Sequence, residues 1–131
     1  MSNGKTRQGL AGEAITKFRA VRYDATGEIF QFNEVATGIL GCGVACETVA
    51  DAASVTFVYE GSATAEAGGA IEPGDYLTVD GSTGKFVVAA ATNAVLGQWH
   101  PATTNGALHA DLADGDIFEM TVFDNKSFVK A

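Results

Sequence analysis

The chain is divided at short, regular intervals by turn residues, and the segments between these turns have the composition of β-strands. Residues 55–59 and 117–123 are rich in β-branched and aromatic side chains, which strands favour. Residues 72–75 read Glu-Pro-Gly-Asp, with proline and glycine at the central positions of a type II turn. No window shows convincing amphipathic-helix spacing. The sequence therefore predicts an all-β fold, a small β-sandwich or barrel built of hairpins.

Two hairpins can be placed from their turns. Residues 24–27 read Asp-Ala-Thr-Gly, in which the aspartate can bond its own backbone and the glycine accepts a positive φ. This turn would join a strand within residues 14–23 to a second strand at residues 28–33. A five-residue loop would join residues 76–79 to residues 85–89. Further strands are expected at residues 39–46, 55–59, 95–99 and 117–123.

Two segments are less regular. Within residues 14–23 the polar and apolar alternation slips near Ala20, which indicates a bulge or the end of regular pairing. Residues 63–70 are rich in alanine and could form one helical turn, which Gly68 and Gly69 would end.

The N-terminal segment differs from the rest of the chain. Residues 1–12 have no period and contain three glycines, so we expect an extended arm outside the core. The 131 residues fit one domain large enough to fold without a metal or disulfide. We therefore expect a flexible N-terminal arm at residues 1–13 and a single β domain at residues 14–131.

Charge is distributed unevenly along the chain. Residues 1–22 hold five basic residues and one acidic residue, a net charge of +4. The remaining 109 residues hold three basic and fifteen acidic residues, a net charge of −12. Such a body repels a phosphate backbone, so we expect no direct nucleic-acid partner. The leading segment suits an acidic partner, although a tail that is merely soluble could carry the same cations.

The two cysteines give little indication of a disulfide or a metal. On one extended strand, Cys42 and Cys46 would have Cα atoms about 13 Å apart, beyond the reach of a disulfide. A bend at Gly41–Gly43 would weaken this argument, but no histidine or second cysteine pair lies nearby to complete a metal site. We interpret both as buried thiols, consistent with a reducing compartment.

Groups suited to catalysis are scarce. His100 and His109 are the only histidines, and neither lies in a recognised triad motif. The acidic residues Asp111, Asp114, Asp116 and Glu119 do not have the spacing of an EF-hand loop. We expect no enzymatic activity, no metal and no cofactor.

No segment has the character of a membrane or secretion signal. Residues 1–12 are polar, and no apolar run approaches the roughly 20 residues needed to cross a bilayer. We expect no membrane partner and an aqueous, intracellular setting.

A family resemblance is carried by residues 14–15, 39–45, 55–61, 70–75, 84–85, 95–97 and 115–122. The order of these strand and turn units resembles that of the small capsid cement, or head decoration, proteins of tailed bacteriophages. The similarity covers roughly residues 11–123. It implies an all-β protein, usually trimeric, that sits on the outside of the capsid at symmetry axes and stabilises the expanded shell. The chain departs from the simplest members in its aromatic content and in an insertion-like stretch at residues 99–112.

From charge and resemblance together we expect the basic arm to contact an acidic surface of the major capsid protein. The partners would be that protein and further copies of this chain, and the location would be the outer surface of the virion, after assembly in the host cytoplasm. Deleting residues 2–12 should then abolish capsid binding and leave the fold intact. The candidate capsid-binding residues are Lys5, Arg7, Leu10, Arg19 and Arg22.

Three alternatives remain open at this stage. A carbohydrate- or host-binding β-module on the virion surface would need Trp99 or the tyrosines exposed on a flat face. A hydrolase would need His100 or His109 to converge with acidic groups in a pocket. A single-stranded nucleic-acid barrel is opposed by the charge of the body.

Overall fold

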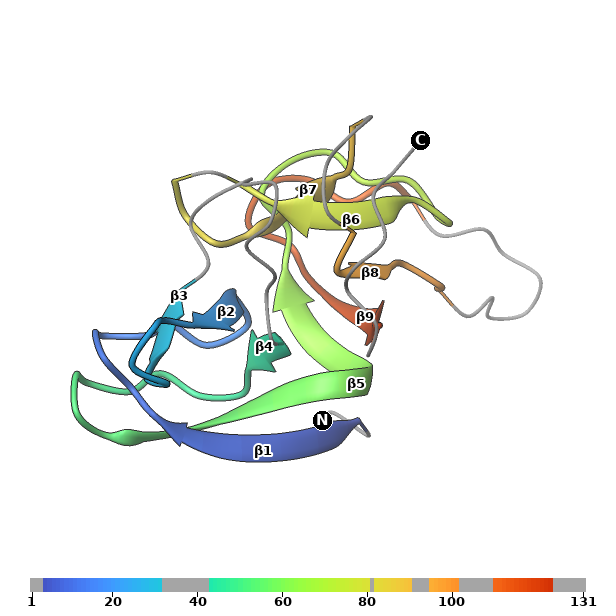
Figure 1. Ribbon diagram of the computed structural model, residues 1–131. Helices are drawn as coiled ribbons and strands as arrows, with labels where there is room; N and C mark the ends of the chain where they lie inside the picture. Colours follow the sequence, from blue (N-terminus) through green and yellow to red (C-terminus); the bar gives the residue numbers. More distant parts are fainter. Residues whose placement is uncertain (1–3, 32–42, 81, 91–94, 102–109, 124–131) are drawn as a thin grey trace.

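The computed structural model describes residues 4–31, 43–80, 82–90, 95–101 and 110–123 (Figure 1). These residues form nine strands and no helix, which confirms the all-β prediction. Accordingly, no helix that could cross a membrane occurs among them. The strands are β1 (Lys5–Leu10), β2 (Ala20–Tyr23), β3 (Ile29–Gln31), β4 (Gly43–Ala45), β5 (Ser54–Glu66), β6 (Tyr76–Val79), β7 (Phe86–Val88), β8 (Gly97–Gln98) and β9 (Ile117–Val122).

Strand β5 connects the two halves of the molecule. Its first part pairs with β1 and β4, and its second part, from Gly61 to Glu66, pairs with β9. All strand pairs are antiparallel, and the sheet runs β3-β2-β4-β5-β9-β8-β6-β7, with β1 added on β5. Gly61 has φ +96°, a conformation that favours glycine, where β5 changes partners. Figure 1 shows β5 curving upward from β1 towards the half that contains β6, β7 and β8.

The half that contains β1 closes on itself like a small barrel. An isolated bridge joins Ala11, directly after β1, to Ile29 of β3, and the Gly12 N–H donates to the Ile29 carbonyl at 2.9 Å. This bridge links the two ends of the series β1-β5-β4-β2-β3. Barrel closure removes free edges and encloses an apolar interior. That interior consists of Ala11, Ile15, Val21, Ile29, Ala45, Val55 and Phe57.

A second core fills the space between the two parts of the sheet. Trp99 and Phe118 meet edge to face there, with ring centroids 6.1 Å apart, and both are largely buried. Its other large members include Leu77, Phe86 and Met120. The inward side chains of β9 alternate with outward ones, as a half-buried strand requires.

The prediction of a flexible arm at residues 1–13 is wrong for the part that the structure describes. Lys5–Leu10 is paired with β5 at six positions, and Ala11 is fully buried. The glycines that indicated flexibility serve close packing instead. A Cβ on Gly9 would lie 2.6 Å from Cγ1 of Ile29, so any larger residue would force this buried side chain to move. The single β domain therefore includes these residues.

The turn predictions are confirmed. Asp24–Gly27 joins β2 to β3, with φ +87° at Gly27. At the Glu72–Asp75 turn the Asp75 N–H donates to the Glu72 carbonyl at 3.1 Å, and Gly74 has φ +89°. Strands β6 and β7 form the second predicted hairpin.

The two irregular segments resolve differently. Regular pairing begins only at Ala20, after a turn in which Phe18 has φ +70°, so the slip marks the start of a strand. Residues 63–66 continue β5, so the helical turn considered for residues 63–70 is wrong. Residues 39–42 of the predicted strand, with Cys42, lie outside the described residues. Residues 43–45 form the buried strand β4, and Cys46 follows it in a bend and is half-buried.

Candidate interaction surfaces

Three of the five candidate capsid-binding residues lie on β1, which is exposed along most of its length. The Lys5 ammonium lies 2.9 Å from Glu60 Oε1, and the Arg7 guanidinium carbon lies 4.3 Å from the centroid of the Tyr59 ring. Leu10 is 50% exposed. Arg7 and Leu10 are three positions apart on a strand, so their side chains project from opposite faces. We call Lys5, Arg7 and Tyr59 the β1 cationic surface.

The other two candidates are held within the fold. Arg19 lies before β2, its Nε 3.3 Å from Glu66 Oε1, and its Nη1 donates to the Thr83 carbonyl at 3.2 Å. Arg22, on β2, packs over the Phe30 ring with 5.6 Å between guanidinium carbon and centroid. Arg19 is only 23% exposed, so it joins three segments of the chain more than it offers charge to a partner.

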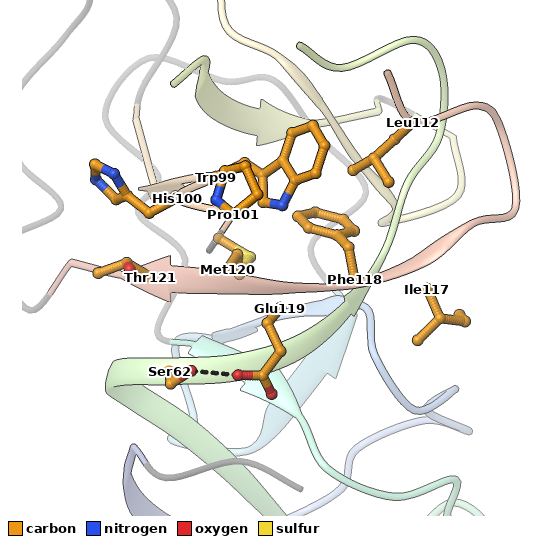
Figure 2. Close-up of a pocket in the computed structure, with 10 residues that line it drawn as sticks. All are labelled: Ser62, Trp99, His100, Pro101, Leu112, Ile117, Phe118, Glu119, Met120 and Thr121. Atoms are coloured by element: carbon orange, nitrogen blue, oxygen red, sulfur yellow. Dashed lines mark hydrogen bonds between the residues drawn. The ribbon is translucent and has the colours of Figure 1, made fainter. Parts of the chain in front are cut away.

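A hollow of about 520 Å³ lies beside β9, and sequence reasoning did not identify it (Figure 2). Trp99, Pro101 and Phe118 lie on one side of it in this view, and Glu119 with Ser62 on the other. Such a combination of apolar walls and a few polar groups is typical of ligand sites. The complete lining is Ser62, Trp99, His100, Pro101, Leu112, Ile117, Phe118, Glu119, Met120 and Thr121. We call it the β9 hollow.

The Glu119 carboxylate is fixed by hydroxyl groups of the neighbouring strand. Ser62 Oγ donates to Glu119 Oε2 at 2.6 Å, and Thr64 Oγ1 donates to Oε1 at 3.4 Å. The register that pairs Thr64 with Glu119 places all three side chains on the same outer face of β5 and β9. The carboxylate therefore has a defined orientation before any ligand arrives.

The groups that a hydrolase would need are not brought together among the described residues. Figure 2 shows the His100 ring directed away from the Glu119 carboxylate. Asp114 accepts from Lys85 at 3.2 Å, and Asp116 accepts from the Ala113 N–H at 2.8 Å, so these acids have structural roles. His109 lies outside the described residues. No group of three potential metal ligands occurs within the described part of the chain.

The aromatic side chains that the structure describes do not form a flat exposed face. Trp99 is 4% exposed, whereas Tyr23 and Tyr76 are 44% and 40% exposed. Tyr23 contacts Phe57 edge to face, and Tyr76 makes the same contact with Phe123. The two exposed tyrosines belong to β2 and β6, which lie in different halves of the sheet. Stacking of a ligand on an exposed Trp99 is thus excluded in this conformation.

A second, smaller hollow of about 410 Å³ lies where β5 bends, lined by Thr6, Phe18, Val44, Ala45, Cys46, Ala63 and Thr64. Cys46 is half-buried, and burial together with the neighbouring Glu47 carboxylate raises the pKa of its thiol above 9.0. A thiol in this setting is poorly nucleophilic at neutral pH.

Comparison with known proteins places the fold but not a sequence family. No protein-family model matches the chain, and no curated protein matches its sequence. Its structure is similar to a solved structure described as the head fiber gp8.5 N base in bacteriophage phi29, with a TM-score of 0.68 and 18% sequence identity. The similarity covers 93% of this chain and 96% of that chain. The shared feature is therefore the whole domain fold.

Proposed function

We propose that this chain is a non-enzymatic structural protein of a bacteriophage head that binds the outer surface of the capsid. The observation that carries the proposal is the likeness to a phage head fibre base across 93% of the chain. The order of strand and turn units in the sequence, which resembles that of capsid decoration proteins, gives independent support. Folds host unrelated functions, so the surface chemistry must also fit.

The β1 cationic surface is the contact we assign to the major capsid protein. Lys5 and Arg7 stand on a chain whose net charge is −8, so they are the natural point of attraction for an acidic shell surface. Because β1 is a paired strand and Arg7 lies against Tyr59, less conformational entropy is lost on binding than with a flexible arm. Leu10 projects from the opposite face of β1 and Arg22 packs over the Phe30 ring, so we assign neither to this contact.

Stabilisation follows from binding the assembled shell only. A protein that binds across several capsid subunits adds its binding free energy to the assembled state and resists separation of those subunits. Association into a trimer, which the resemblance implies, would multiply a weak single contact through effective concentration. Binding at capsid symmetry axes is the arrangement in which one such trimer meets equivalent subunits.

The test combines purified protein with expanded, undecorated phage shells and measures binding by co-sedimentation and electron microscopy, with the mass of the free protein measured in parallel. Arg7→Glu should reduce binding strongly, and added salt should weaken binding of the unaltered protein. Lys17→Glu is the matched control, because it makes the same charge change at an exposed position in the turn before β2. The assignment would be contradicted if the unaltered protein did not bind shells, or if Arg7→Glu and Lys17→Glu bound them equally well.

A further inference from the structure

We propose that the β9 hollow is a binding site for a neutral saccharide of one or two rings. The inference goes beyond capsid binding, because it concerns a different surface from β1 and needs no capsid. It rests on three properties of the hollow: its size, its two kinds of wall and its charge.

The size suits a small ligand. A volume of about 520 Å³ lies in the usual range of roughly 300–1,000 Å³ for small-molecule sites. It is partly open to solvent, so a ligand can reach it without a change in the fold. A partner side chain alone would leave most of it unfilled.

The two walls match the two surfaces of a sugar ring. Pro101, Leu112 and the 52% exposed Ile117 supply apolar area for the C–H face of a pyranose, and the buried Trp99 lies behind them. Ser62, Glu119 and Thr121 supply hydroxyl and carboxylate groups for its hydroxyl edge. Because Ser62 holds the carboxylate at 2.6 Å, Glu119 is oriented to accept hydrogen bonds from a bound polyol.

Charge and burial disfavour the other ligand classes. Glu119 and the net charge of −8 repel an anionic sugar or phosphate. A purely apolar segment would bury the carboxylate with only two hydroxyl donors, which carries a desolvation cost. A cation could pair with Glu119 but would make little use of the apolar wall and the Thr121 hydroxyl. A neutral polyol satisfies both walls.

Tryptophan fluorescence can measure binding at this site, because Trp99 is the only tryptophan of the chain and lines the hollow. We would titrate the full chain with methyl glucoside, methyl galactoside and N-acetylglucosamine and follow tryptophan fluorescence. At least one sugar should give a saturable change. Glu119→Gln should weaken that binding roughly tenfold, since a charged acceptor becomes neutral. Glu72→Gln, at an exposed position in the turn before β6, should leave sugar binding unchanged.

One further variant and one further ligand distinguish a sugar site from the alternatives. Thr121→Val removes a hydroxyl and keeps the side-chain shape, so it tests the site if Glu119→Gln perturbs folding. Methylguanidinium tests for a cation site. Binding of that cation without any sugar, sugar binding that neither substitution changes, or no fluorescence response to any sugar at its solubility limit would each overturn the proposal. Shell binding is measured separately through Arg7→Glu, so the two proposals succeed or fail independently.

Discussion

Arg19 and Glu66 are 47 positions apart in the sequence, yet Nε of the first lies 3.3 Å from Oε1 of the second. The Glu66 carboxylate also pairs with Lys85, whose ammonium lies 3.4 Å from Oε2. The same ammonium lies 3.2 Å from Oδ1 of Asp114. The hydrogen bond with Asp114, followed by the interactions with Glu66, raises the pKa of Lys85 above 10.5. One glutamate at the end of β5 thereby connects the approach to β2 with the β6–β7 hairpin and the turn before β9.

Replacing Glu66 should therefore cost more stability than replacing a glutamate of a shorter but exposed ion pair. Glu66→Gln leaves Arg19 without its counter-charge at a site where the Glu66 side chain is 18% exposed, and we expect a loss of about 1–2 kcal/mol. Glu60→Gln breaks the 2.9 Å pair with Lys5, but that lysine is 66% exposed and Glu60 35%. Such pairs contribute about 0–1 kcal/mol. Urea unfolding of both variants measures the difference, and equal losses would contradict a structural role for Glu66.

The close approach of β4 to β5 predicts that Gly43→Ala is destabilising. A Cβ at Gly43 would collide with the carbonyl oxygen of Val58 and would lie 3.0 Å from Cδ2 of Phe57. A backbone oxygen held in a strand ladder cannot move aside cheaply, so we expect a loss of about 1–3 kcal/mol. Gly69→Ala is the control, because nothing lies within 4 Å of a Cβ there. Thermal melts of the two alanine variants should separate clearly, and coincident melts would show that β4 can shift.

The hairpins could be predicted because their signals are local. Asp24 accepts hydrogen bonds from the N–H groups of Thr26 and Glu28, and the glycine that follows takes the positive φ expected of it. In residues 72–75 the signal is also local: Pro73 has a fixed φ, and Gly74 takes the positive φ that the turn requires. Each turn is determined by residues within about four positions of one another, so the local sequence is sufficient to predict it.

The strands and site that sequence reasoning missed depend on distant partners. Gln8 of β1 pairs with Thr56, and nothing in the polar, glycine-containing sequence of residues 4–12 indicates that partner. In residues 62–67, Ser, Thr and Glu alternate with alanine, which is the period of a strand, but alanine-rich composition favoured a helical turn. Ser62 meets Glu119 only because β5 and β9 share a register.

Acid should weaken the β2–β3 hairpin through Asp24. The side-chain hydrogen bond from Thr26, 2.7 Å long, lowers the pKa of Asp24 below 3.8, aided by backbone N–H groups and opposed by desolvation. A lowered folded-state pKa gives stability that is present above 3.8 and is lost as pH falls through the folded value. Asp24→Asn should therefore be less stable at neutral pH and show a shallower loss below about pH 4.

Unfolding curves at several pH values measure this effect. Asp111→Asn, at an exposed position outside the hairpin, is the control and should keep the full acid dependence. An Asp24→Asn variant that loses stability with acid as steeply as the unaltered protein would show that another carboxylate is responsible.

Because β1 is a strand of the barrel, an N-terminal truncation should destabilise the fold as well as remove candidate capsid contacts. Deleting residues 2–12 removes all six pairs with β5 and uncovers Val55 and Phe57, which are buried in the intact chain, so the expectation that this deletion leaves the fold intact is wrong. We expect the free energy of unfolding to fall by more than about 3 kcal/mol, or the domain not to fold. Arg7→Glu alters the same surface without removing a strand, so it should unfold much like the unaltered protein. If the truncated chain unfolded at the same urea concentration as the intact one, β1 would be dispensable. Otherwise, a truncation that abolishes shell binding reports loss of the fold, and only single substitutions on β1 can identify the residues that touch the capsid.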